Sequence, residues 1–261
     1  MQSNNPVFAR SEGFNGKPSL DGGYSLPPLE GRMTIDTVVE KTAITLGLVV
    51  TAAAVTWFMI GDIYASPRAI GLAWGAAMGG AIIGLVLSLV VSFRKKINPA
   101  LVMAYAVVEG VFVGAFSKII SSYIGDATIV FQAVMATMVA FAATLAAYKF
   151  FNIRVTPKFR RMVTIAVFAF LAVMLVNFGL SMFGVLDQGG LRSFGTLGLV
   201  VSLFAVGLAV FCLIMDFDYI ERGIAMGLPE KESWRGAFGL TVTLIWMYIE
   251  ILRIIAILRS N

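Results

Sequence analysis

Two full charges lie inside the last apolar run of the sequence, in its stretch from Thr241 to Leu258. Glu250 and Arg253 are three residues apart, so on a helix they share one face. A charged side chain at the centre of a membrane helix costs several kcal/mol, about 2.5–3.5 on insertion scales. Such a residue needs an oppositely charged partner, a water-filled cavity or a change of protonation. We expect the final helix to take part in the function of the protein.

A further acidic residue falls in an earlier apolar run. Glu109 lies about ten residues into that run, hence ~15 Å deep at 1.5 Å per residue, and Glu250 lies ~20 Å deep from the same side. We expect Glu109, Glu250 and Arg253 to form one coupled charged unit. That unit could be a structural ion pair between helices or a relay for protons or cations.

Two aspartates mark the end of the sixth apolar run. Asp216 and Asp218 are expected in a short acidic turn over residues 215–222, where Glu221 would join them. Carboxylate oxygens are the ligands that Ca²⁺ prefers, so Asp216 is a candidate for transient Ca²⁺ contact. The alternative is that these residues form a solvated helix end. Either way, no permanently bound cofactor is expected.

Several chemistries are excluded by what the sequence lacks. It contains no histidine, so the side chain that most often titrates near neutrality is missing and any pH response must come from carboxylates. Its single cysteine cannot form an intramolecular disulfide. We find no nucleotide-binding motif and no serine nucleophile with a histidine base. We therefore do not expect an enzyme.

The composition is that of a polytopic membrane protein. The chain is 59% hydrophobic and only 13% charged, whereas soluble domains carry roughly 25% charged residues. Seven apolar runs approach the ~20 residues needed to cross a bilayer. They are Thr42–Ile60, Ile70–Phe93, Pro99–Ser121, Ala127–Tyr148, Met162–Leu186, Gly195–Met215 and Ala237–Leu258. We predict an all-α fold of seven transmembrane helices, with the last helix central because its charged face must point inward.

The distribution of basic residues predicts the orientation. Fifteen of the twenty Lys and Arg residues lie before the first run or in the second, fourth and sixth connections, and four lie on the opposite side. By the positive-inside rule the N-terminus is cytoplasmic and the C-terminus outside. The net charge of +5 thus reflects contact with a lipid bilayer, and no nucleic-acid partner is expected. Residues 1–33 are rich in Gly, Pro, Ser and Asn and are predicted to be a disordered tail before a domain of residues 34–261.

Small and polar residues in the runs predict helix packing. Gly71, Gly75 and Gly79 are four residues apart, with Gly80 and Gly84 on a neighbouring stripe, and Gly110 and Gly114 repeat the spacing. Such spacing lets helix backbones approach closely, so we expect these faces to pack against other helices. Asn177, in the fifth run, is expected to make an interhelical hydrogen bond.

Three segments together resemble the transmembrane Bax inhibitor motif family. They are Asn98-Pro99 followed by Tyr105-Ala-Val-Val-Glu109-Gly110, then Met215-Asp216-Phe-Asp218-Tyr-Ile220, and the closing Ile251-Leu-Arg253-Ile-Ile-Ala-Ile-Leu258. The resemblance covers roughly residues 40–258, and the basic fourth connection and long leading segment are similar to a bacterial branch. It implies a location in the bacterial inner membrane.

The resemblance also implies a mechanism. Members of the family have a central last helix and a pH-sensitive calcium leak, whose gate is a pair of aspartates sharing one proton. The first aspartate matches Asp216, and the second falls on Thr243, so the aspartate pair as such is missing. Glu250 lies one heptad further along the same face, and Arg253 matches a basic position of the family.

Two classes of function follow from these observations. The first is an ion leak or a pH-sensitive cation transporter for calcium or protons, with Asp216, Asp218, Glu109, Glu250, Arg253 and Thr243 in the ion path or sensing pH. The alternative is a regulator that conducts nothing and binds a membrane protein partner in stress, proteolysis or cell-survival control.

Overall fold

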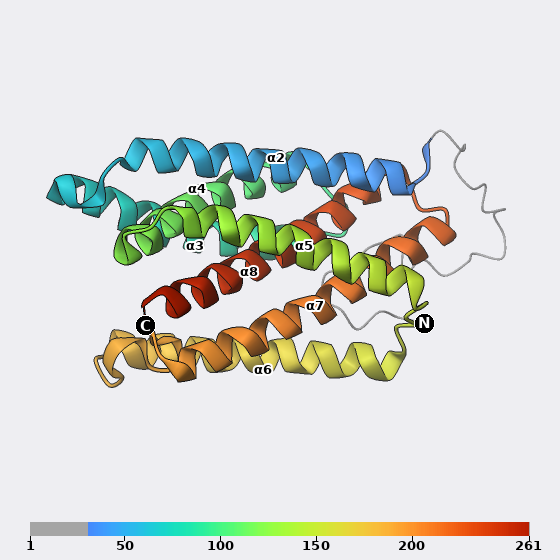
Figure 1. Cartoon of the computed structure of the whole chain (residues 1–261). Helices are drawn as coiled ribbons and strands as arrows, with labels where there is room; N and C mark the ends of the chain where they lie inside the picture. Colours follow the sequence, from blue (N-terminus) through green and yellow to red (C-terminus); the bar gives the residue numbers. More distant parts are fainter. Residues whose placement is uncertain (1–30, 261) are drawn as a thin grey trace. The chain divides into compact units, whose positions relative to one another are not determined.

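The computed structural model describes residues 31–260, and seven long helices make up most of this part of the chain (Figure 1). They are α2 (Ile35–Ile60), α3 (Pro67–Phe93), α4 (Pro99–Ile124), α5 (Thr128–Phe150), α6 (Pro157–Met182), α7 (Thr196–Ala225) and α8 (Ser233–Ser260). Each is long and apolar enough to cross a membrane. The predicted all-α fold of a multi-pass membrane protein with seven spans is confirmed.

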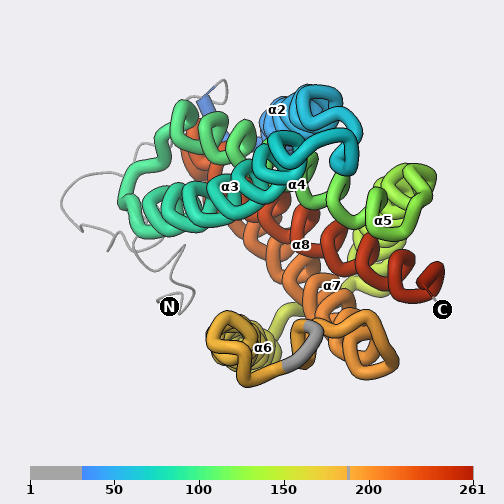
Figure 2. The backbone as a smooth tube through the Cα atoms, turned by 90° about the vertical axis from the view of Figure 1, so that its left-hand side faces the viewer, coloured from blue at the N-terminus to red at the C-terminus, as the bar shows by residue number. Residues whose placement is uncertain are grey.

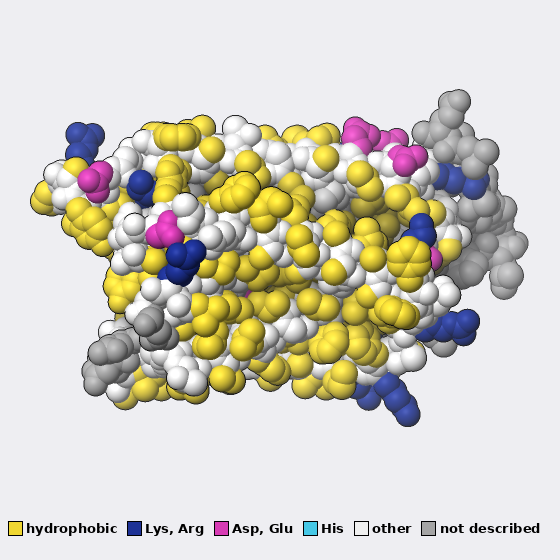
Figure 3. Space-filling model, viewed as in Figure 1, with side chains coloured by type: hydrophobic (Ala, Val, Ile, Leu, Met, Phe, Trp, Pro, Cys, Tyr) yellow, Lys and Arg dark blue, Asp and Glu magenta, His cyan; other side chains and the backbone are white. Residues whose placement is uncertain are grey.

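Apolar side chains cover the outward faces of these helices. Phe58 on α2, Phe131 on α5 and Phe178 on α6 are all exposed. Figure 3 shows hydrophobic side chains over most of the helical surface, with Lys, Arg, Asp and Glu near helix ends. Extensive exposed apolar surface is unfavourable in water and is satisfied by lipid tails. These faces therefore contact the bilayer.

The last helix is the most buried of the seven. In its most apolar stretch 72% of the residues are buried, against 11–44% in the other spans. The fully buried side chains of α8 include Met247, Leu252 and Ile257. The last helix is therefore largely buried, as its charged residues led us to expect.

Helix α7 does not end where the sequence predicts. It runs to Ala225, so the turn expected over residues 215–222 is wrong, and Asp216 and Asp218 lie within a continuous helix. No Gly or Pro interrupts this segment, and Arg222 binds Asp218 one turn earlier, with 2.9 Å between Nη2 and Oδ1. Residues two apart on a helix point ~200° apart. Asp216 and Asp218 therefore do not converge as they would in the expected acidic turn.

The chain divides into two compact units, which we describe separately. The first comprises residues 1–116 and 218–242, and the second comprises residues 117–217 and 243–261. In the described part of the first unit, α2, α3 and most of α4 lie together with the end of α7 and the start of α8 (Figure 2). The second unit contains α5, α6 and the remaining parts of α4, α7 and α8.

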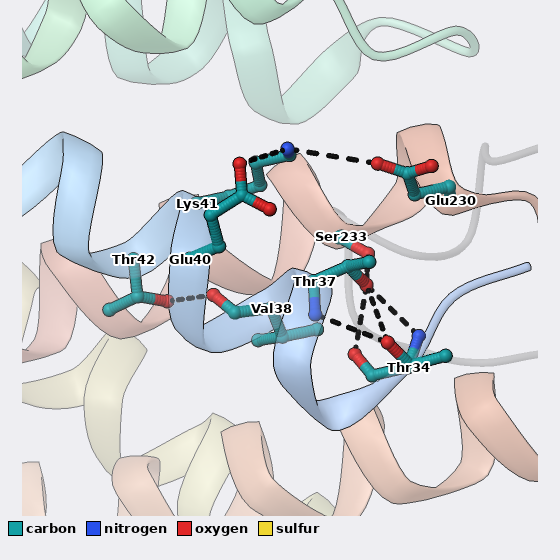
Figure 4. Close-up of polar contacts among 8 residues, drawn as sticks. All are labelled: Thr34, Thr37, Val38, Glu40, Lys41, Thr42, Glu230 and Ser233. Atoms are coloured by element: carbon teal, nitrogen blue, oxygen red, sulfur yellow. Dashed lines mark hydrogen bonds and ion pairs between the residues drawn. The ribbon is translucent and has the colours of Figure 1, made fainter.

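Hydroxyl pairs join α2 to the start of α8 in the first unit. The Thr37 and Ser233 hydroxyls lie 2.8 Å apart (Figure 4), and those of Thr45 and Thr241 are at the same distance. Both pairs are separated by 196 residues in the sequence, so the two helices run parallel here. Thr34 caps α2 by accepting a hydrogen bond from the Thr37 amide at 3.1 Å, which explains why the helix begins at Ile35 rather than at Thr42.

The predicted tail lies mostly outside the described residues. Residues 31–33 are described, and there the Met33 amide donates to the Leu228 carbonyl at 2.7 Å. The Met33 side chain is buried, and its sulfur lies near Gly223 of α7. This short segment thus packs against the end of α7.

A fully buried arginine stabilises the start of α8. The Arg235 Nε donates to Glu232 at 2.8 Å. Its Nη2 donates to the carbonyls of Arg94 and Lys95 at 3.4 and 3.2 Å. These carbonyls follow the last turn of α3, where carbonyl groups lack partners within the helix. Arg235 therefore connects α8 to the end of α3.

The two glycine sets differ in what they contact. On α4, a methyl group at Gly110 would lie 2.5 Å from the Val49 carbonyl of α2, and Gly114 lies against the backbone of Ala53. On α3, no described atom lies within 4 Å of such a group at Gly71, Gly75 or Gly79. On the neighbouring stripe of α3, a methyl group at Gly80 would lie 2.9 Å from Phe112 of α4. Gly80 and the α4 glycines thus allow close helix packing as predicted, whereas Gly71, Gly75 and Gly79 meet no described atom.

Replacing Gly110 with alanine is therefore expected to destabilise the protein. The new methyl group would meet a helix backbone that cannot move aside as a side chain can, and such overpacking costs about 1–3 kcal/mol. Thermal unfolding in detergent would measure the change. Gly75→Ala is the matched control, because its methyl group meets no described atom. Equal melting temperatures for the two variants would contradict the α2–α4 contact.

Candidate functional site

The aspartate that the family resemblance singles out makes one close contact in the second unit. The Thr243 hydroxyl on α8 donates to Oδ2 of Asp216 on α7 at 2.7 Å. Thr243 is buried and Asp216 is half-buried. The residue that replaces the second aspartate therefore lies beside the first. A threonine can donate this hydrogen bond at every accessible pH, whereas two carboxylates at this distance would have to share a proton.

The other acidic residue of this segment has a different partner. Asp218 lies in the first unit and accepts hydrogen bonds from Nε and Nη2 of Arg222 at 3.1 and 2.9 Å. Among residues 31–260, no group of three or more Cys, Asp or Glu side chains could hold a metal ion. Calcium contact at Asp216 stays a prediction. The oxygen atoms that could ligate the ion there are those of the Asp216 carboxylate and the Thr243 hydroxyl.

Glu250 pairs with an arginine from the connection between α6 and α7. Its Oε2 lies 2.8 Å from Nη1 of Arg192, and the glutamate is only 2% exposed. The predicted partner was Arg253, which lies one turn further along α8 and remains within electrostatic reach of Glu250. The closest opposite charge thus comes from the connection between α6 and α7. In the sequence, Arg192 served only as one of the basic residues that predict the orientation.

Arg253 holds the same connection by its backbone. Its Nη2 donates to the carbonyl of Arg192 at 2.6 Å, and its guanidinium lies 5.6 Å from the ring centre of Phe194. The Phe194 ring in turn packs against Tyr123 of α4, with 5.1 Å between centroids. The Nε of Arg253 is buried and has no hydrogen-bond partner among the described residues.

Asn177 of α6 fixes the beginning of this connection. Its amide nitrogen donates to the Gly189 carbonyl at 3.1 Å, and its Oδ1 accepts from the Leu191 amide at 2.8 Å. The expected interhelical hydrogen bond is thus a pair of bonds to the 3₁₀ turn η3 (Asp187–Arg192). We call residues 187–194 the α6–α7 cap, because they fold back onto the end of the α8 segment that carries Glu250 and Arg253.

The sequence held one signal for this cap. Gly189 and Gly190 both have positive φ values, 86° and 57°, which side chains rarely adopt. A glycine pair indicates a sharp turn in the connection, but it does not say that the next residues reach a buried glutamate. Arg192 and Phe194 were therefore missed as functional candidates.

Glu109 lies in the first unit and has its own surroundings. Its carboxylate lies against Gly84 of α3, where an added methyl group would be 2.6 Å from Oε1. The Tyr105 hydroxyl, one turn earlier on α4, hydrogen-bonds to this carboxylate. Within the second unit, Glu250 and Arg253 both contact Arg192. That Glu109 joins them in one charged unit stays a prediction.

Comparison with known proteins identifies a family. The family model described as Bax inhibitor 1 like matches residues 5–260. The match covers all of the helices and nearly the whole chain. Among curated proteins, none matches this chain.

Proposed function

Because the chain belongs to the Bax inhibitor 1 like family, we propose that it is an ion leak or a pH-sensitive cation transporter for calcium or protons. We propose that it lies in a bacterial inner membrane with its N-terminus in the cytoplasm and its C-terminus outside, in keeping with the distribution of Lys and Arg. Enzymatic activity and a resident cofactor form no part of the proposal.

One observation carries the proposal. The Thr243 hydroxyl lies 2.7 Å from the Asp216 carboxylate, at the place where the family resemblance puts a pair of aspartates. The Thr243 hydroxyl is neutral, so this contact supplies no counter-charge to the Asp216 carboxylate, and a passing cation could supply one. Threonine does not titrate, so this pair lacks the shared proton by which the family is expected to respond to acid. Any pH response would then depend on Glu109, Glu250, Asp216 or Asp218.

The contacts of α8 in the second unit support an ion path that two pairs of side chains close at different depths. Thr243 and Glu250 are seven residues apart, hence ~10 Å along one face of the helix. Asp216 of α7 occupies the first level, and Arg192 of the α6–α7 cap occupies the second. A cation moving along this face would have to separate Thr243 from Asp216 and displace Arg192 from Glu250. Arg253 would assist closure by holding the cap backbone.

Flux measurements with purified protein in liposomes would test this function. Replacing Asp216 with asparagine removes the charge and keeps the shape of the side chain. We expect the Ca²⁺ or proton flux to fall about tenfold, which corresponds to ~1.4 kcal/mol at the barrier. Asp36→Asn is the control, because Asp36 is exposed in the first turn of α2. Equal flux in wild type and Asp216→Asn would exclude this carboxylate from the path.

The second candidate function is a regulator that binds a membrane protein partner and conducts nothing. It is favoured by the substitution of Thr243 for the aspartate of the family's gate, since a hydroxyl hydrogen-bonded to Asp216 can serve as a permanent bond between α7 and α8. The same liposome assay separates the two functions. Wild-type flux no higher than that of protein-free liposomes, at any pH tested, would favour the regulator.

A further inference from the structure

The connection between α5 and α6 combines charge and apolar exposure in one short segment. Residues 149–161 contain five Lys and Arg residues and no Asp or Glu. We call this stretch the α5–α6 basic segment. It lies wholly within the second unit and joins the ends of two membrane spans. Its charges therefore lie at the level where lipid headgroups meet water.

Most of these charges have no carboxylate partner in the described part of the chain. Lys149, Arg154, Lys158 and Arg161 are exposed and form no ion pair among the described residues. Five basic residues elsewhere, Lys41, Arg192, Arg222, Arg235 and Arg259, each have a carboxylate partner, whereas Arg94, Lys95 and Lys231 are exposed like the four residues of this segment. Within the described residues the basic segment thus presents four positive charges without a carboxylate partner, and such charges attract an external anion.

Two adjacent aromatic side chains accompany the charges. Phe150 and Phe151 are 81% and 79% exposed, among the most exposed large apolar side chains of the described chain. Figure 3 shows Lys and Arg together with hydrophobic side chains near the ends of α5 and α6 that this segment joins. Aromatic side chains beside Lys and Arg are typical of protein surfaces that bind the interface of an anionic membrane. A soluble acidic partner would satisfy the charges but would give these apolar rings no hydrocarbon to enter.

Hydrogen bonds and packing fix both ends of the segment. The Phe151 amide donates to the Ala147 carbonyl at 3.0 Å, and the Thr156 hydroxyl caps α6 by accepting from the Phe159 amide at 3.2 Å. The Val155 side chain is buried. At one end of the segment the Phe159 ring packs edge-on against Phe211 of α7, with 5.7 Å between centroids. The charges and the aromatic pair are therefore presented together.

We propose that the α5–α6 basic segment is a binding site for anionic phospholipids. Lys149, Arg154, Lys158 and Arg161 contact the phosphate groups, and Phe150 and Phe151 enter the acyl region below them. Arg and Lys bind phosphate by charge-assisted hydrogen bonds, and their long stems can lie along the lipid while the charged ends reach the headgroups. This site is independent of the proposed ion path, since it shares no residue with it.

The test compares two triple variants of the full chain in mixed micelles. One is Lys149→Gln, Arg154→Gln, Lys158→Gln. The control is Arg94→Gln, Lys95→Gln, Lys231→Gln, which removes three exposed charges from other connections. Thermal unfolding is measured with added phosphatidylglycerol or phosphatidylcholine, and bound lipids are counted by native mass spectrometry. We expect phosphatidylglycerol to raise the melting temperature of wild type and control alike, and to lose at least half of that effect in the first variant.

The outcomes separate the specific site from general electrostatics. Equal loss of the phosphatidylglycerol effect in both triple variants would overturn the proposal, because net charge alone would then account for it. No loss in either would also overturn it and would point to an acidic protein as the partner. A second variant, Phe150→Ser with Phe151→Ser, should retain fewer lipids of both kinds while keeping the preference for phosphatidylglycerol. Unchanged lipid retention in that variant would contradict the role given to the aromatic pair.

Discussion

Replacing Arg235 with leucine is expected to lower the free energy of unfolding by about 3–5 kcal/mol, the range for breaking a buried ion pair by removing one partner. Three groups lose their donor at once: the Glu232 carboxylate and the carbonyls of Arg94 and Lys95. Glu232 is largely buried, with a side chain only 13% exposed, so water replaces the lost contact poorly.

Thermal unfolding in detergent would measure this loss of stability. Two further variants serve as a control and as a conservative substitution. Arg94→Leu removes an exposed arginine from the same region and should change the melting temperature little, since the contact to Arg235 uses the backbone carbonyl. Arg235→Lys keeps the charge but cannot donate from Nε and Nη2 together, so an intermediate loss is expected. Equal melting temperatures for Arg235→Leu and Arg94→Leu would show that the buried contacts add nothing to stability.

The fold was largely predictable because a bilayer imposes strict length and composition on each span. Seven apolar runs become seven helices, and the charged residues of the last run indicate its burial. Helix ends were less predictable. Helix α2 begins at Ile35 because Thr34 caps it, and α7 continues past Met215 because no residue there interrupts a helix. Hydropathy reports where lipid ends, whereas a helix can extend into water.

The contacts of the candidate site were only partly predictable. Alignment of the closing Ile251-Leu-Arg253 block placed Thr243 at the position of the family's second aspartate, and the structure places its hydroxyl beside Asp216. By contrast, the partner of Glu250 depends on the path of a connection, and no helical periodicity describes that path. Arg192 contacts Glu250 from the α6–α7 cap, whose backbone Asn177 holds by two hydrogen bonds. Spacing along one helix favoured Arg253, which is near but uses its hydrogen bond on the cap backbone.

Removing the ion pair between Arg192 and Glu250 is expected to lower the free energy of unfolding by a similarly large amount. Glu250 is 2% exposed, so Arg192→Leu leaves its carboxylate buried without its closest counter-charge, at a cost of about 3–5 kcal/mol. Glu250→Gln alone should also destabilise the protein, because Arg192 then loses its partner. The double variant should be more stable than the sum of the two losses predicts, with a coupling energy of about 1–3 kcal/mol.

A parallel double-mutant cycle with Arg253→Leu and Glu250→Gln supplies the comparison. Arg253 binds the Arg192 carbonyl and lies over Phe194, so its coupling to Glu250 should be smaller than that of Arg192. A larger coupling for Arg253 would reverse the assignment and restore the pairing that helical spacing suggests.

Ion flux through liposomes would test whether this pair also matters for function, since Arg192→Leu frees the α6–α7 cap from Glu250. If the protein conducts ions along this face of α8, the variant should leak faster than wild type at neutral pH. A destabilised variant with unchanged flux would instead leave the Arg192–Glu250 pair as a purely structural contact and remove the second closure from the proposed path.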